Sequence, residues 1–359
     1  AFALDASGCE DGVCEFAAKD LLANVTRPEF GFGVAGGTVR ITTEEGDVLP
    51  LCPCAFRGTL ELTGGGVFQT VGTNVIHGVS GWHSNTCEVV VKGATVEQGA
   101  LPVYLGQRVY RTDSDNQTNP GQLTVRDGGK WMTTVPALPT ATTEDAYLAG
   151  ALVVGYGAAG VLNIQDGGVV SNKLYVGGGT QSPSYSFGDG GIYVGNGGRL
   201  FISSALAPNW PSGSMIGAYG YGYLQVEPGA TVEADVGMRE AVIGGYGPGV
   251  VHLYGGRFEQ SGNYGLAYGP GEILNYAENA GHNDVSADIY VRGGTFKVGG
   301  NLATCAGSGS SALIAVDGVG ARIEQVGGSL NCSQAKDSQT IISASDGGVI
   351  TVDRVYAYP

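Results

Sequence analysis

The sequence predicts an all-β protein, a right-handed parallel β-helix (β-solenoid) of about eleven coils preceded by a short N-terminal capping helix. Three observations support this prediction. Glycine makes up 64 of the 359 residues, a share that excludes a helical bundle. Hydrophobic residues make up 43% and charged residues only 14% of the chain, unlike the composition of disordered proteins. A strand-and-turn motif recurs along the chain, and recurrence at one phase is the signature of a repeat architecture.

The recurring motif is a glycine, alternating apolar residues and then a glycine-rich turn. Alternation predicts a strand with one buried face, and a second short strand should follow the turn. The copies recur about every 32 residues, a period typical of solenoids. They are GTLELTGGGVF from Gly58, GQLTVRDGGKW from Gly121, GVLNIQDGGVV from Gly160, GYLQVEPGATV from Gly222, GVVHLYGGRF from Gly249, ADIYVRGGTF from Ala287, ALIAVDGVGARI from Ala312 and GVITVDRV from Gly348, with weaker copies near Gly37, Cys87 and Gly191.

The turns explain how the chain bends between strands. Asp-Gly-Gly at 127–129, 166–168 and 346–348, and Asn196-Gly197-Gly198, supply residues able to take positive φ. A unit this small cannot bury its own apolar face, but stacked units bury a continuous core. An antiparallel sandwich is the alternative, although a sandwich needs no motif recurring at one fixed phase.

The repeat also resembles that of a known group. Val154 to Gly157, running on to GVLNIQDGG at 160–168, resembles the repeats of autotransporter-passenger-like surface β-helices, and the likeness covers roughly residues 35–355. The resemblance implies a β-helix at a cell surface or outside the cell. It implies no particular activity, because adhesins, spacers and surface-layer-like proteins share such repeats.

The two ends of the predicted rod differ. Residues 1–34 form an N-terminal segment in which 11–25 has the apolar spacing of a helix, and we expect this helix to cap the first coil. Residues 35–359 form the β-helix, with long loops near 101–120, 132–148 and 264–286. No cap follows the last strand, so we expect head-to-tail contact between copies; the alternative is that both termini fold back on their own rod. The expected interface residues are Phe2, Leu4, Val352, Val355, Tyr356 and Tyr358.

Cysteines give one specific contact prediction. Aligning 298–305 with 326–332 places Cys305 beside Cys332, within the Cα separation that a disulfide accepts. Four of the five remaining cysteines could form two bridges that join the cap to the first coils, leaving one over. These five are Cys9, Cys14, Cys52, Cys54 and Cys87. The spacing Cys52-Pro53-Cys54 is a weak zinc motif, so no metal site is predicted.

Candidate binding residues are few. His77, Trp82 and His83 share one loop. Such a group could hold a ligand, but more often its side chains only occupy a surface turn. Four tyrosines in Tyr-Gly settings predict an aromatic column at one corner, facing inward as packing or outward as a surface for sugar rings. They are Tyr156, Tyr219, Tyr246 and Tyr268. Three glycosylation sequons start at Asn24, Asn116 and Asn331. No cofactor is expected; the Asp-Gly-Gly turns hold Ca²⁺ only as a weak alternative, since the calcium-binding nonapeptide is not reproduced.

Charge and hydropathy narrow the function. A formal net charge of −15 disfavours nucleic acid and anionic membranes as partners, and no apolar stretch is long enough to insert into a membrane. A start at Ala1 without Met is that expected of a mature secreted chain. The sequence therefore predicts an extracellular structural protein, not an enzyme, that assembles with itself into a filament, sheath or surface layer. The alternatives are an adhesin-like glycan binder and a polysaccharide lyase or hydrolase.

Overall fold

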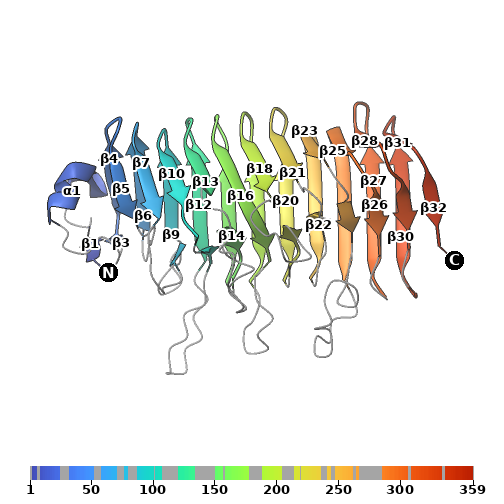
Figure 1. Cartoon of the computed structure of the whole chain (residues 1–359), viewed down its shortest axis with the longest axis horizontal. Helices are drawn as coiled ribbons and strands as arrows, with labels where there is room; N and C mark the ends of the chain where they lie inside the picture. The colour runs from blue at the N-terminus through green and yellow to red at the C-terminus, as the bar shows by residue number, and fades with distance from the viewer. Residues whose placement is uncertain are drawn as a thin grey trace, which may run out of the picture.

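The computed structural model describes residues 2–5, 9–24, 32–51, 58–70, 77–79, 87–100, 102–106, 120–133, 150–156, 158–177, 188–203, 214–218, 220–235, 241–243, 247–261, 264–266, 285–305, 309–333 and 336–358. These residues form a rod of stacked coils, with the N- and C-termini toward opposite ends (Figure 1). Every pairing between named strands is parallel, and the strands pair with their equivalents in the adjacent coils. The predicted parallel β-solenoid is confirmed.

Three ladders of strands run the length of the rod. The first ladder contains the strand that opens each repeat, except for the copy from Gly348, whose strand Val349–Val352 belongs to the second ladder. The hydrogen-bonded register of the first ladder is continuous through twelve strands of the described chain. They are β2 (Val13–Ala17), β4 (Thr38–Thr43), β6 (Gly58–Gly64), β9 (Cys87–Lys92), β12 (Gly121–Arg126), β15 (Gly160–Ile164), β17 (Gly190–Val194), β20 (Gly222–Val226), β23 (Gly249–Gln260), β25 (Ser286–Val298), β27 (Ser311–Asp317) and β30 (Gln339–Ser345).

The second ladder contains the strand expected after each turn. It comprises β5 (Val48–Leu51), β7 (Val67–Thr70), β10 (Thr95–Gln98), β13 (Lys130–Thr133), β16 (Val169–Val176), β18 (Arg199–Ser203), β21 (Thr231–Asp235), the later parts of β23 and β25, β28 (Arg322–Gln325) and β31 (Val349–Val352).

A third ladder completes each coil and was not part of the sequence prediction. It comprises β8 (His77–Val79), β11 (Val103–Leu105), β14 (Ala151–Val154), the end of β16, β19 (Met215–Ile216), β22 (Ala241–Ile243), β24 (Tyr264–Leu266), β26 (Leu302–Thr304), β29 (Leu330–Cys332) and β32 (Val355–Ala357). Two of the loops expected from the sequence therefore contain strands, β11 and β24. Most of the remaining loop residues, 107–119, 134–149 and 267–284, lie outside the described residues.

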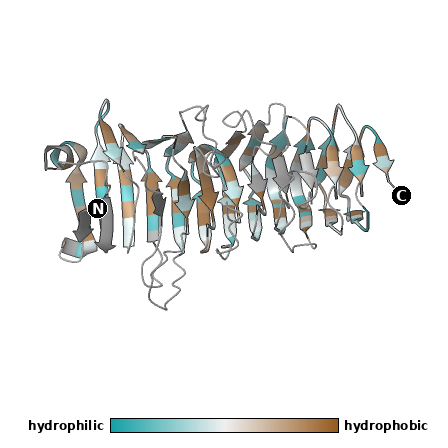
Figure 2. Ribbon diagram, turned by 60° about the horizontal axis from the view of Figure 1, so that its bottom comes forward, coloured by the Kyte–Doolittle hydropathy of each residue, from teal (hydrophilic) through white to brown (hydrophobic). Residues whose placement is uncertain are grey.

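The core is built from columns of inward side chains, one residue from each coil. In the first ladder Leu162, Ile192, Leu224, Val251 and Ile289 follow each other in register, and all are fully buried. Figure 2 shows the apolar residues recurring from strand to strand along the rod. Burying such a column removes apolar surface from water on both sides of every coil, so stacking supplies the core that one coil lacks.

The helix predicted over 11–25 is half wrong. Val13–Ala17 is the strand β2, and the helix α1 covers only Ala18–Asn24. Pairing with β4, from Val13↔Thr38 to Ala17↔Thr42, outweighs the helical spacing because it extends the ladder by one coil. The sequence predicts about eleven coils, and the first ladder has twelve strands; the additional strand is β2. Ala18 and Leu21 of α1 are buried over the first coil, so a short cap is present.

Two different constraints act on the residues of the Asp-Gly-Gly turns, a positive φ and a close approach of neighbouring coils. Asp166 and Gly167 have φ values of +52° and +76°, so they use the left-handed region as expected. Gly168 has another constraint: an added Cβ would lie 2.1 Å from the backbone oxygen of Val125 on the previous coil. The third residue of each turn is therefore glycine because neighbouring coils approach too closely for a side chain. Gly129, Gly198 and Gly348 meet the same obstacle.

We expect Gly168→Ala to destabilise the protein by more than about 3 kcal/mol, because backbone atoms of two coils must separate. Gly167→Ala is the matched control; its Cβ would meet only atoms at 3.7 Å or farther, so it should cost about 1–2 kcal/mol from the φ value alone. Chemical denaturation of both variants measures the difference. Equal losses would show that close approach of the coils is not the constraint.

Candidate functional site: an aromatic row on the first ladder

Four aromatic rings line the outward face of the first ladder on four consecutive strands. They are Tyr193 of β17, Tyr223 of β20, His252 of β23 and Tyr290 of β25, and we call them the aromatic row. Centroids of successive rings lie 5.7, 5.5 and 4.6 Å apart, the spacing of rings in contact. The residues on either side of each ring point into the core, so strand alternation holds all four rings on the outside.

Two further tyrosines border the row. Tyr254 lies two residues after His252, and their ring centroids are 5.7 Å apart. Tyr221 lies two residues before Tyr223 and is 41% exposed; Tyr193 is 40% exposed. The other rings are half-buried. The result is a partly exposed aromatic surface, the kind of surface that marks recognition sites more often than packing.

Hydrogen bonds fix the rings in place. The Tyr223 hydroxyl donates to Oε1 of Gln225 at 2.7 Å, and the Tyr254 hydroxyl lies 3.2 Å from Nδ1 of His252. The Tyr290 hydroxyl donates to the carboxylate of Asp288, two residues earlier on the same face. Side chains held by such bonds lose little freedom when a ligand binds, so the row is preorganised.

Burial favours the uncharged forms of the rings in the row, and charged side chains lie at its edges. Burial, with a smaller effect from Arg292, lowers the pKa of His252, which favours the neutral imidazole. Burial also raises the pKa of the Tyr223 hydroxyl. Arg292 lies over the ring of Tyr254 at 5.8 Å, at the strand-end edge. Asp288, whose carboxyl pKa burial raises, lies at the strand-start edge.

The four tyrosines predicted from the sequence to form a column are not those of the aromatic row. Tyr156 is half-buried against Tyr104, with centroids 4.3 Å apart, while Tyr219, Tyr246 and Tyr268 lie outside the described residues. The aromatic row has its own signal: in GGIYV, GYLQV, GVVHLY and ADIYV the aromatic residues fall at outward positions of aligned strands. A comparison of the outward-facing positions between copies of the repeat, instead of the Tyr-Gly settings, predicts the aromatic row.

The expected assembly residues fall into two groups. Phe2 and Leu4 lie in β1 (Phe2–Asp5), which pairs in parallel with β3 (Phe32–Gly36) of its own chain. Within the described chain β1 pairs on one edge only, so contact of Phe2 and Leu4 with another copy stays a prediction. At the other end Val352 is half-buried, and Val355, Tyr356 and Tyr358 are exposed.

The C-terminal coil leaves core side chains uncovered. Ile342 continues the buried column of Ile289 and Ile314, yet it is 39% exposed. Val355 continues the column of Leu302 and Leu330, yet it is 57% exposed. Within the described chain β30, β31 and β32 each pair on one edge only. This end is thus an apolar face bordered by free backbone groups.

The predicted Cys305–Cys332 disulfide is absent, and both residues are free thiols. The alignment has the register of the structure, since Leu302 pairs with Leu330, but it sets Cys332 level with Thr304 and not with Cys305. Cys305 is buried, and its thiol donates to the backbone oxygen of Gln339 at 3.1 Å. Successive side chains of a strand point to opposite faces, so an offset of one residue is enough to keep two cysteines from pairing.

We expect peptide mapping without reduction to recover Cys305 and Cys332 unlinked. Burial raises the pKa of both thiols, so less thiolate is present at neutral pH, and alkylation in the folded protein should be slow and quicken as pH rises. Alkylation of unfolded protein is the control for reagent activity. A peptide pair joined through these two residues would contradict the free-thiol assignment.

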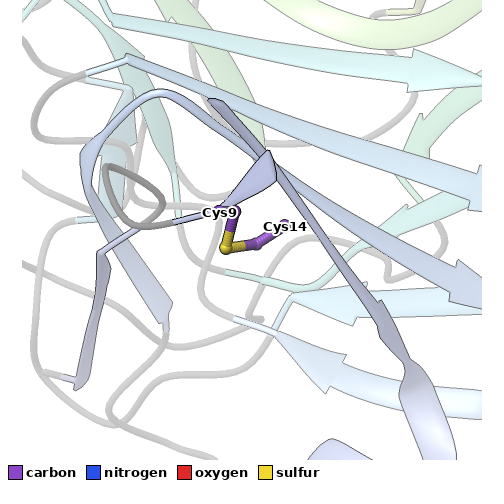
Figure 3. Close-up of a disulfide and its surroundings, with 2 residues drawn as sticks. All are labelled: Cys9 and Cys14. Atoms are coloured by element: carbon purple, nitrogen blue, oxygen red, sulfur yellow. A yellow bond between two sulfur atoms is a disulfide. The ribbon is translucent and has the colours of Figure 1, made fainter. Parts of the chain in front are cut away.

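One disulfide is present at the N-terminal end. Cys9 and Cys14 are bonded, with Cα atoms 5.4 Å apart (Figure 3). The bridge closes a short loop that contains the 3₁₀ turn η1 (Glu10–Gly12) and fastens it to β2. Both cysteines lie within the N-terminal segment 1–34, so this bridge is not one of those expected between the cap and the later coils. Cys52 and Cys54 lie outside the described residues, and the side chain of Cys87 in β9 is not among those described.

Other candidates from the sequence contribute little to a site. Asn331 is half-buried in β29, where its Oδ1 accepts from Ser329 Oγ at 3.0 Å; Asn24 ends α1 and Asn116 is outside the described residues. His77 lies in β8, whereas Trp82 and His83 also fall outside them. Within the described residues, no three His, Cys, Asp or Glu side chains group as a metal site.

The outward face of the second ladder carries charged side chains on β23, β25 and β28. A shallow groove of about 550 Å³ lies there, lined in part by Arg257, Lys297 and Glu324. Glu259 accepts from Lys297 Nζ at 3.1 Å and is also paired with Arg257. These three side chains form a surface ion-pair network across two coils.

The structure also contains a buried lysine that the sequence pattern does not predict. Lys173 of β16 is almost fully buried, with Nζ 5.1 Å from the ring centroid of Tyr175. Burial lowers its pKa to about 8, because the charged ammonium loses hydration. The only signal in the sequence is a lysine inside the apolar run of β16.

Comparisons with known proteins found no match to this chain. No protein family matches the chain, and no curated protein or solved structure does either. The described part of the chain contains no helix with the length and apolar character needed to cross a membrane.

Proposed function

We propose that this protein is a non-catalytic, extracellular β-solenoid that binds a polysaccharide along the aromatic row. The observation that supports this proposal is the run of four contacting rings on four consecutive coils. The Cys9–Cys14 disulfide fits an extracellular location, because structural disulfides persist in oxidising compartments.

The chemistry of the row suits sugars. A pyranose ring has a flat apolar face and an equatorial rim of hydroxyls, so it packs on an aromatic ring and hydrogen-bonds at its edges. The row offers rings for the faces, and Gln225 and the tyrosine hydroxyls for the rim, the mixture typical of ligand sites. Because the row crosses the coils along the rod, a linear polymer could contact several rings at once.

We expect at least one soluble polysaccharide to retard the protein in affinity gel electrophoresis. The double variant Tyr193→Ala/Tyr223→Ala should weaken that binding at least tenfold, about 1.4 kcal/mol, since both rings are lost from the contact surface.

Phe201→Ala is the matched control, because Phe201 is an outward, half-buried ring on the second ladder. It should leave binding unchanged. No retardation by any neutral, acidic or basic polysaccharide, or equal weakening by the control, would count against the aromatic row as the binding surface.

The exposed C-terminal coil favours a second candidate function, end-to-end assembly between copies. Ile342 and Val355 occupy core positions that another β coil would cover, and the free edges of β30 to β32 would accept its backbone hydrogen bonds. We propose a second copy of the chain as the occupant, which would give an architectural filament, sheath or surface layer.

For this second function, Ile342→Lys/Val355→Lys should lower the assembled mass measured by light scattering, because two charges would enter the interface. Val319→Lys is the control; Val319 is 91% exposed in the turn before β28, and assembly should persist there. Wild-type protein at the mass of one chain under all conditions would sink the assembly candidate while leaving the glycan proposal in place.

A further inference from the structure

The aromatic row leads into a groove at the turn between the first and second ladders, through which β23 and β25 run unbroken. Tyr254, which borders the row, is followed directly by Gly255 and Gly256, and both glycines line the groove of about 550 Å³ on the second ladder. On the next coil the guanidinium of Arg292 lies over the Tyr254 ring, 5.8 Å from its centroid. Arg292 stands two residues before Gly294, which also lines the groove. The row and the groove therefore meet at Tyr254 and Arg292, where one extended ligand could contact both.

The floor of the groove is bare because neighbouring coils approach each other closely there. A Cβ added to Gly256 would lie 2.6 Å from the backbone oxygen of Glu227, and one added to Gly294 would lie 1.9 Å from the backbone oxygen of Gly256. Neither position therefore accepts a side chain. The chemistry of the groove depends on the second-ladder side chains that line it, among them the cations Arg257 and Lys297.

Cations outnumber carboxylates around the groove, although the whole chain has a formal net charge of −15. The segments 254–260, 292–298 and 317–325, which lie on three consecutive coils, hold four cations and three carboxylates. Charges farther away than a Debye length of about 10 Å are largely screened, so the local excess decides which ligands the groove attracts. The cations are Arg257, Arg292, Lys297 and Arg322, and the carboxylates are Glu259, Asp317 and Glu324.

Two of the four cations have no carboxylate partner within the part of the chain that the structure describes. Arg257 and Lys297 share a single carboxylate. Arg292 and Arg322 form no ion pair with another described residue, and both are exposed. The strand register sets Arg322 level with Thr295, which lines the groove. Exposed guanidinium groups that can bind an anion therefore border the groove.

We propose that the groove binds the carboxylate groups of an acidic polysaccharide, a uronan whose chain continues onto the aromatic row. Cationic side chains form their strongest hydrogen bonds with anions, and a planar carboxylate matches two N–H donors of an arginine. Sugar faces farther along the same chain pack on the rings. This inference rests on the proposed polysaccharide-binding function and names the substrate class of that site.

The test compares two uronans, oligogalacturonate and oligomannuronate, with their methyl esters of equal length by isothermal titration calorimetry. The ester keeps the sugar backbone and loses the charge. We expect at least one acidic oligomer to bind at least tenfold more tightly than its ester. In Arg257→Gln/Lys297→Gln this preference should fall below threefold, whereas affinity for the ester stays the same because the ester has no charge for the two cations to bind.

Lys130→Gln/Arg199→Gln is the matched control, because both residues occupy the register position of Arg257 on coils outside the groove. It removes the same charge and should keep the preference. Equal binding of acid and ester, a preference that survives the groove variant, or equal loss in the control overturns the uronate site and leaves the proposed function standing. Binding of neither uronan also overturns the site, and binding of no polysaccharide at all overturns both proposals. Thermal unfolding of each variant confirms that the fold is intact.

Discussion

The structure depends on parallel hydrogen bonding between each coil and the next in strict register. That bonding brings neighbouring backbones so close at the turns that Gly168 has no room for a Cβ beside the oxygen of Val125. The glycine load is thus a consequence of stacking as much as of turn geometry. Strict register also gives every inward position a column of equivalents above and below, from which the continuous apolar core is made.

The same register makes the surface. Residues about one repeat apart in sequence, such as His252 and Tyr290, become ring neighbours because their strands are stacked in phase. A functional surface on a solenoid is therefore formed by residues at corresponding positions of successive repeats rather than by residues close together in the sequence. β23 and β25 continue from the first ladder into the second, so each carries a ring of the aromatic row and, farther along, charged residues of the second ladder.

Sequence reasoning found the strands and turns, because alternation and the recurring glycines report directly on the backbone. It failed where a choice depended on pairing at a distance. Val13–Ala17 has a helix-compatible pattern, and only β4 turns it into a strand. Cys305 and Cys332 were aligned in the correct register but lie one residue apart in it, and the sequence spacing does not show that this offset separates their side chains. The aromatic row was missed because the chosen signal was a Tyr-Gly setting instead of outward strand positions.

The aromatic row is not required by the stack that presents it. At the equivalent outward position nearer the N-terminus, Arg40 pairs with Glu15 and with Glu61, the latter at 2.9 Å, and two coils past Tyr290 the position is Ser343. Ions, hydroxyls and rings thus occupy one column with the same backbone beneath them. Since the fold accepts polar residues there, partly exposed rings on four successive coils are better explained by what they contact outside the rod than by packing within it.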